Sequence, residues 1–466
     1  MKLLNKLIFG SVLLMILFSC KKELEIRPSD SIDDVKAFQS VADLEKGLFG
    51  VYSSYGGGLF NGIYIGSILA DEVKISNENR GQGQFTFKWQ FTAGGGEHNG
   101  DYTTFYRAID RAHRVLAAME QVTPANAAEA TLKSRIQAEL TALRGMSLYQ
   151  LLIRFMPDGY NSTALGVPVL LESNLTGQPS RNTVAEVVSQ IEADLTSARN
   201  SSDLPGSVVD GLRISKAAVA GYQARLALLK RDWANAITFA TDAITLSGAA
   251  LATIAQYPAI WSDAVNTEVI LRFRNNYSIT TLWRDTNGDV FFEPSDKLKA
   301  QYNRVTDIRY STFFGSVTTG GQNDTSTVKK YPGSSLGPQF NDIKDLRVSE
   351  MYLIRAEANA ELNNLVNAAN DVNAIRSNRI TGYTNVTFAT KDEAITAIIT
   401  ERFKELPYEG FRFFDLKRRS LPVSRFASDV QSPNWQNLAA SNFRFALPIP
   451  QTEIFANPNT VQNPGY

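Results

Sequence analysis

Four carboxylates lie close together in the segment 401–415 and are candidates for acid–base catalysis. They are Glu401, Glu405, Glu409 and Asp415, in the stretch ITERFKELPYEGFRFFDLKR. Paired carboxylates serve as acid and nucleophile or base in glycoside hydrolysis. A proton-donating carboxyl, however, needs surroundings that raise its pKa. Glu401 and Glu405 lie four residues apart on one face of a predicted helix, with basic residues nearby at Arg402, Lys404 and Arg412. This composition favours a charge-balanced structural network over a catalytic pair.

The stretch DTNGDVFFEPSD begins like a calcium-binding loop, with oxygen-bearing side chains at Asp285, Asn287 and Asp289. The sixth position of such a loop needs glycine and the twelfth needs glutamate. Here these positions hold Val290 and Asp296. Asn-Gly is a hairpin turn in its own right. The sequence therefore favours a hairpin, and it predicts neither a metal site nor a cofactor.

The histidine content and the charge balance argue against a zinc site, a serine–histidine triad and nucleic-acid binding. His98 and His113 are the only histidines, and neither has a partner at zinc-ligand spacing or within a serine–histidine triad signature. Basic and acidic residues number 47 each, so the formal charge is zero. Because nucleic-acid binding needs a basic surface, a nucleic-acid partner is disfavoured.

Cys20 is the only cysteine, and its position suggests lipidation. Lys2 and Lys6 precede a short apolar run, which ends in Leu17-Phe18-Ser19-Cys20. A basic start, an apolar run of about a dozen residues and a small residue are typical of a secretory signal peptide. The end of the run resembles a bacterial lipobox, in which cleavage leaves a lipidated cysteine at the new N-terminus. The alternative is an ordinary signal peptide with an incidental cysteine.

Aromatic side chains are the candidates for sugar contact, because flat rings stack on the C–H face of a sugar. Tyr277 and Trp283 occur in a polar stretch, where burial has no obvious reason. Trp89 lies on one predicted strand face with Phe85, Phe87 and Phe91, which are expected in the core. Trp233 lies in a helical hairpin and is also expected in the core.

Helical periodicity predicts most of the elements that must position these residues. Apolar residues recur every three to four positions over 101–120 and over 131–155, and the second run ends before Pro157. Residues 214–246 and 349–379 each predict two helices joined by a tight turn. Such pairs resemble tetratricopeptide repeats, whose period is about 34 residues. Alternation predicts a strand over 85–91, loops with short strands over 267–337 and a short helix over 452–455.

The chain resembles the SusD/RagB family of nutrient-binding outer-membrane lipoproteins of the Bacteroidota. The resemblance rests on Cys20 and on the motifs LRVSEMYLIRAEANAEL, VNAIRSN, ITERFKELPYEGFRFFDLKR and LPIPQTEIFANPNTVQNPGY. FEPSDKLKAQYNRVTDIRYS and ILADEV fit more loosely. The resemblance implies a mainly α fold, in which tetratricopeptide-like helical pairs support a loop-rich ligand face with a few short β-strands.

The same resemblance implies a binding protein rather than an enzyme. Such a protein binds a glycan, an oligosaccharide or another nutrient and delivers it to a SusC-type TonB-dependent transporter. It is anchored to the outer membrane by lipid and faces the cell surface. By order and spacing, Asp71 and Arg80 are the acid and the arginine of the family's ligand site, which join Trp89, Tyr277 and Trp283 as expected contacts. The alternative is a tetratricopeptide-like scaffold that binds a protein and no small ligand.

The expected organisation has four parts. A signal peptide occupies 1–19, a lipidated tether 20–34, an N-terminal helical region 35–245 and a C-terminal region 246–466. The last two are expected to form one body.

Overall fold

The computed structural model describes residues 37–157, 159–174, 176–275, 278–285, 287–317, 325–338 and 340–466. The predicted signal peptide, Cys20 and the tether lie outside these residues. The described chain is mainly helical, with short strands, as expected from the sequence. None of its helices combines the length and the apolar composition that a membrane crossing requires.

The helices are α3 (Val41–Ile68), α4 (Gln84–Phe87), α5 (Asn99–Met119), α6 (Ala127–Phe155), α7 (Val184–Asn200), α8 (Lys216–Lys230), α9 (Trp233–Ser247), α10 (Tyr257–Trp261), α11 (Asp296–Lys299), α12 (Ile308–Phe313), α13 (Val348–Glu361), α14 (Leu365–Ser377), α15 (Lys391–Glu405), α16 (Arg412–Arg418) and α17 (Gln451–Ala456). The strands are β1 (Val73–Ile75), β2 (Val269–Phe273), β3 (Phe292–Pro294), β4 (Phe314–Val317), β5 (Thr325–Val328), β6 (Ile343–Arg347), β7 (Val423–Ser424) and β8 (Asn437–Leu438). They pair antiparallel as β1–β3, β2–β6, β4–β5 and β7–β8.

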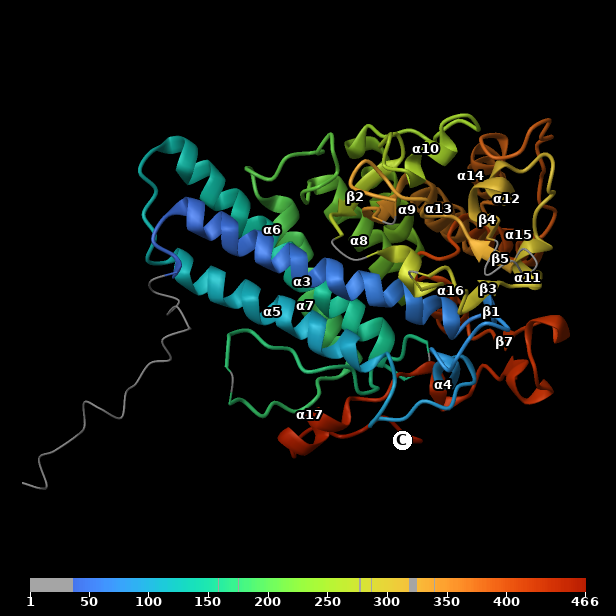
Figure 1. The fold of residues 1–466 in the computed structure, drawn as a ribbon. Coiled ribbons are helices and arrows are strands. Elements are labelled where there is room, and N and C mark those ends of the chain that lie inside the picture. The colour runs from blue at the N-terminus through green and yellow to red at the C-terminus, as the bar shows by residue number, and fades with distance from the viewer. Residues whose placement is uncertain are drawn as a thin grey trace, which may run out of the picture.

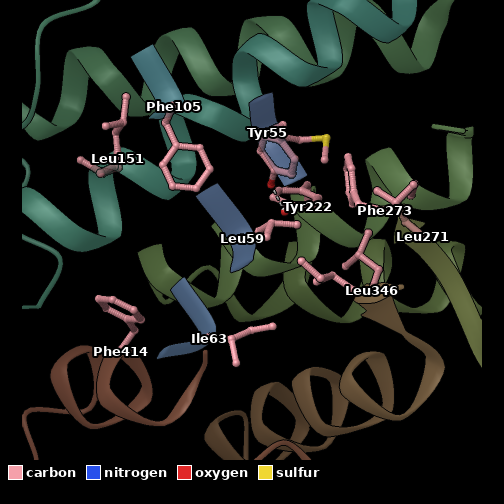
Figure 2. Close-up of a cluster of buried hydrophobic side chains, with 14 of the residues drawn as sticks. Tyr55, Leu59, Ile63, Phe105, Leu151, Tyr222, Leu271, Phe273, Leu346 and Phe414 are labelled. Atoms are coloured by element: carbon pink, nitrogen blue, oxygen red, sulfur yellow. Dashed lines mark hydrogen bonds between the residues drawn. The ribbon is translucent and has the colours of Figure 1, made fainter. Parts of the chain in front are cut away.

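Helix α3 is the long central element, and it lies between α5 and α6 (Figure 1). Ser40 begins it, because the Ser40 hydroxyl accepts a hydrogen bond from the backbone N–H of Asp43. Figure 2 shows one face of α3, with Tyr55, Leu59 and Ile63, facing apolar side chains from both halves of the chain. These are Phe105, Leu151, Tyr222, Leu271, Phe273, Leu346 and Phe414. One core therefore joins the two halves around α3.

The two helical hairpins, α8–α9 and α13–α14, confirm the predicted pairs. Arg231 and Asn363 adopt positive φ values at the two turns, which reverses the chain within a few residues. The first hairpin packs closely because its facing side chains are small. These are Ala217, Ala220 and Ala224 on α8 and Ala236, Ala240 and Ala243 on α9, all buried. Trp233 is only partly buried, against this core.

The predicted strand over 85–91 is wrong. Residues 84–87 form the single turn α4, which begins after Gly83 at φ 62° and is followed by Trp89 at φ 55°. The turn places Phe87, Trp89 and Phe91 in the core but leaves Phe85 69% exposed. A helical turn separates neighbours by about 100° rather than 180°, so the single aromatic face of a strand does not form.

Candidate ligand-binding face

The end of α3 supports a surface built from two distant segments, which we call the loop face: residues 76–91 with 283–285 and 287–291. Strand β1 leaves α3 and pairs with β3, so the two segments lie beside one another. Ser76 and Asn79 both donate hydrogen bonds to the carbonyl of Phe291, at 3.1 and 3.0 Å. Backbone pairing and side-chain contacts thus fix this surface.

Arg80 is the predicted site residue that reaches the surface of the loop face. Its side chain is 74% exposed and forms an ion pair with Asp289 of the opposite segment. Asp285 is occupied by its own turn, since its Oδ1 accepts the backbone N–H groups of Asn287 and Asp289, each at 2.9 Å. Arg284 and Val290 pair across this turn, which confirms the predicted hairpin. Across the described residues, no cluster of three or more His, Cys, Asp or Glu residues could hold a metal ion.

Asp71 is buried and paired beneath the loop face. Its carboxylate accepts bonds from Arg412 Nε at 2.8 Å and Lys297 Nζ at 2.7 Å. Burial alone raises the pKa of Asp71, but the two cations outweigh burial and lower it to about 2. Asp71 therefore ties α16 and α11 to the end of α3.

The two predicted site tryptophans are buried as well. Trp89 donates from Nε1 to the carbonyl of Leu69 at 3.0 Å. Trp283 is 1% exposed and packs against Tyr408 and Tyr64, with ring centroids 5.5 and 6.2 Å apart. The expectation that Trp283 is exposed because its neighbours are polar is therefore wrong: the ring turns inward while Arg284 and Asp285 face the turn. Tyr277 lies outside the described residues.

Arg425 holds the loop face together from within. Its guanidinium forms no ion pair with the described residues and instead donates to backbone carbonyls of three segments. These are Ile68, Leu69 and Ala70 at the end of α3, Phe87 in α4, and Trp435 near β8. It lies 3.7 Å from the ring centroid of Phe87 and 4.2 Å from that of Trp89. Burial lowers its pKa to about 9. This cation fixes α4 and the β7–β8 hairpin against α3.

Sequence reasoning missed two aromatic side chains that are exposed on α4 and on the β7–β8 hairpin. Phe85 is exposed at the outer side of α4, and Trp435 is partly exposed on the β7–β8 hairpin, with Lys88 Nζ 4.4 Å from its ring centroid. The stretch QSPNWQN around Trp435 carried a signal, because an aromatic among turn-forming polar residues lacks a helical or strand pattern that would bury it.

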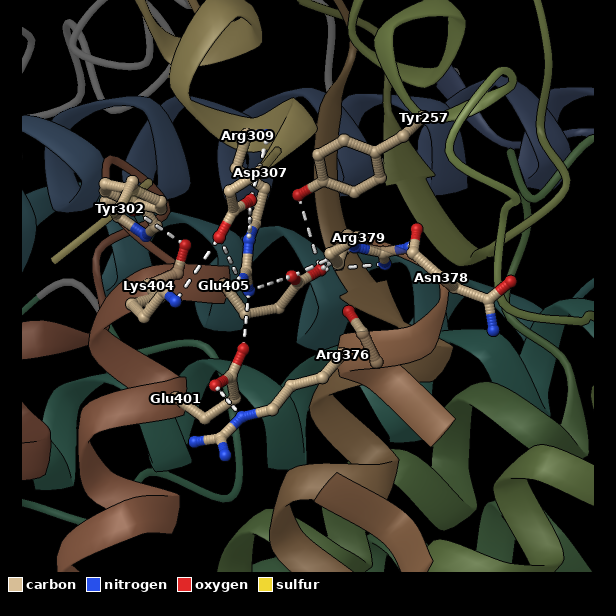
Figure 3. A network of polar contacts seen from close by, with 12 residues as sticks. Tyr257, Tyr302, Asp307, Arg309, Arg376, Asn378, Arg379, Glu401, Lys404 and Glu405 are labelled. Atoms are coloured by element: carbon tan, nitrogen blue, oxygen red, sulfur yellow. Dashed lines mark hydrogen bonds and ion pairs between the residues drawn. The ribbon is translucent and has the colours of Figure 1, made fainter. Parts of the chain in front are cut away.

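The carboxylates of α15, Glu401 and Glu405, are fully buried and belong to a separate polar network (Figure 3). Glu405 contacts Arg309 at 3.1 Å, and Arg347 and Arg379 at 3.0 Å each. Glu401 contacts Arg309 and Arg376, both at 2.7 Å. The structural interpretation is thus supported, but the partners come from other elements. Of the basic residues expected from the sequence, Lys404 pairs with Asp307, which itself pairs with Arg309 of this network. Arg402 pairs with Asp415, another of the four carboxylates, and only Arg412 pairs outside the group, with Asp71.

The cations of this network lower the pKa of its carboxylates, which disfavours proton donation by them. Burial raises the pKa of Glu401, but Arg309, Lys404 and Arg376 outweigh burial and lower it to about 2. Arg379, Arg347 and Arg309 likewise hold the pKa of Glu405 well below its usual range. A general acid needs the opposite shift. The geometry therefore suits a structural clamp between α12, β6 and α15.

A cavity of about 70 Å³ with apolar and charged lining residues lies between α3, α6, α8 and α16. Among its lining residues, Arg225 is paired with Asp345 and Glu350. Arg402 Nη1 is buried without a hydrogen-bond partner among the described residues. Such a volume has room for about two water molecules, each needing polar partners. The cavity is separate from the loop face.

Two family models match the chain, one in each half. Residues 272–466 match the SusD family model. Residues 24–228 match a related model described as starch-binding associating with outer membrane. A SusD-like protein, P38, from Formosa agariphila is 22% identical, with 97% of this chain and 96% of that protein covered.

Solved structures share the fold over nearly the whole described chain. A SusD superfamily protein from Bacteroides thetaiotaomicron is 25% identical with a TM-score of 0.80, covering 91% of this chain and all of that one. A putative sugar-binding protein from Bacteroides vulgatus is 24% identical with a TM-score of 0.78, covering 92% and 99%. Fold, helical hairpins and both family matches agree, and the chain belongs to the SusD/RagB family.

Proposed function

We propose that this protein binds glycans or oligosaccharides at the loop face and delivers them to a SusC-type TonB-dependent transporter. The observation that carries the proposal is family membership across both halves, including a match to a family described as starch-binding and associated with the outer membrane. The putative sugar-binding protein of the same fold supports it. The loop face adds an exposed cation and an exposed aromatic ring, the side-chain types that sugar hydroxyls and sugar C–H faces require.

Within this proposal, some of the predicted residues contact the glycan and the others hold the loops in place. Arg80 contacts the glycan, together with Asp289. Asp71, Trp89 and Trp283 hold these loops from below, because each is buried and already engaged with neighbouring residues. Tyr277 remains a predicted contact from the sequence.

Affinity electrophoresis tests the binding step. The purified mature chain is run in gels that contain amylopectin, xylan, laminarin or polygalacturonate, with albumin as the control for mobility. We expect one of these polysaccharides to retard the protein and Arg80→Ala to weaken the retardation. Unchanged mobility in every gel would contradict glycan binding. Arg80→Ala is a surface change and is not expected to unfold the chain.

Delivery and anchoring form the second part of the proposal. A lipidated Cys20 would hold the body at the outer membrane, where the partner transporter lies. Co-expression with a SusC-type transporter from the same organism, followed by purification through a tag on this protein, should recover both chains. Recovery of this protein alone under conditions that keep the transporter folded would contradict delivery to that partner.

A further inference from the structure

We propose that Phe85 and Trp435 form an aromatic subsite at the edge of the loop face, which stacks on a hexopyranose ring of the glycan. This inference rests on the proposed function and adds a place and a contact chemistry to it. The two rings come from segments about 350 residues apart in the sequence, α4 and the β7–β8 hairpin.

Phe85 is exposed although the surrounding turn is tightly held. Its neighbours Thr86 and Phe87 are fully buried, and Phe87 lies against Arg425. The positive φ values of Gly83 and Trp89 enclose the turn on both sides. A ring that is 69% exposed on a fixed turn contributes little to the core, so its apolar face is free to contact a ligand.

Trp435 is brought to the same place by Arg425. The guanidinium Nη1 donates to the carbonyl of Phe87 at 2.8 Å and to that of Trp435 at 3.1 Å, so the two backbones share one donor. Lys88, three residues after Phe85, places its ammonium group 4.4 Å from the Trp435 ring. Lys88 and Arg425 therefore link the turn that carries Phe85 to Trp435.

The polar groups around these rings suit a sugar better than a protein surface. Gln90 and Asn434 are exposed and offer amide donors and acceptors, while the Lys88 ammonium group donates to Gln84 Oε1 at 2.7 Å and lies over the Trp435 ring. The acid of the hairpin, Asp429, is buried and accepts the backbone N–H groups of Asp296 and Lys297. Flat rings bordered by amides are the arrangement that binds sugars by stacking and hydrogen bonding.

Two substitutions with a matched control test the subsite. Phe85→Ala and Trp435→Ala are compared with Phe455→Ala, which removes a ring of similar exposure, 80%, on α17. The probe is whichever of amylopectin, xylan, laminarin or polygalacturonate retards the unaltered chain. We expect each subsite variant to weaken the affinity by about tenfold, as loss of an aromatic anchor commonly does. Phe455→Ala should bind like the unaltered chain.

The outcomes separate this inference from the proposed function. If the unaltered chain is retarded and both subsite variants are retarded equally, the subsite is overturned while glycan binding stands. If the unaltered chain is retarded by none of the four, glycan binding fails and the subsite with it. Melting curves guard against misfolding. Because Trp435 is partly buried, Trp435→Phe, which keeps an aromatic ring, should retain most of the affinity.

Discussion

At the scale of the residue, neighbouring carboxylates behave in opposite ways because their partners differ. Asp71 pairs with two cations, which lower its pKa to about 2. Glu72 is equally buried, but no described residue forms an ion pair with it, and its Oε2 accepts the backbone N–H of Tyr408 at 3.0 Å. Burial raises the pKa of Glu72 to about 7. Removal from water favours the neutral acid unless an opposite charge compensates.

Glu72 gives the stability of the fold a pH dependence. Its usual pKa is 4.5, so between pH 4.5 and 7 the unfolded chain releases a proton that the folded chain retains. The contribution of Glu72 to stability therefore falls as pH rises through this window. We expect Glu72→Gln, which stays neutral, to be more stable than the unaltered protein at pH 8 by a few kcal/mol.

At pH 4.5 this advantage should disappear. Melting curves of both proteins from pH 4.5 to 8 measure the difference, and the direct comparison cancels the titration of His98 and His113. An advantage of equal size at both ends of the range would show that Glu72 does not titrate there.

Glu405 should be among the costliest charges to remove. It contacts three arginines, all fully buried with it, so Glu405→Ala leaves cations without compensation and should cost about 3–5 kcal/mol of stability. Glu192→Ala is the control, because Glu192 is half exposed in its pair with Lys230 and should cost at most about 1 kcal/mol. Urea unfolding measures both. Equal costs would refute the structural role of the network.

At the scale of the element, local patterns predicted what local interactions determine. The hairpins α8–α9 and α13–α14 follow from helical periodicity, small facing residues and tight turns, and the structure has them where the sequence placed them. Turn α4 was missed, because the burial of Phe87 and Trp89 around Arg425 depends on a segment more than 300 residues away. Arg309, Arg347 and Arg379 were missed for the same reason. A contact between residues far apart in the sequence produces no periodic pattern in either segment, so the local sequence does not reveal it.

Two tryptophans that differ in burial test how much each contributes to the stability of the core. Trp233 begins α9 at the edge of the core, whereas Trp261 at the end of α10 is fully buried. We expect Trp261→Ala to cost about 3–5 kcal/mol of stability. Trp233→Ala should cost roughly half of that, since the free energy follows the apolar area removed from water. Denaturant unfolding of the two variants compares them, and a larger cost for Trp233→Ala would contradict this ranking.

At the scale of the whole molecule, a helical body carries the loop face at the end of α3, and the sequence predicts a lipid anchor at Cys20. Cys20 precedes helix α3 in the sequence, and the buried core of the described residues begins at Val41. We expect Cys20→Ala to leave the membrane fraction while its melting temperature stays unchanged. Fractionation of cells expressing both forms measures this. Membrane retention at the unaltered level would contradict the anchor.

The most direct test of glycan binding at the loop face is hydrogen exchange with and without the polysaccharide that retards the chain. If glycan binds at the loop face, exchange should slow in peptides from 76–91 and 283–291, and in 423–438 at its edge, where binding restricts loops at the surface. The helical hairpins α8–α9 and α13–α14 should exchange as before. Slowed exchange on the hairpins, with the loop face unchanged, would contradict the account and favour a tetratricopeptide-like binding surface.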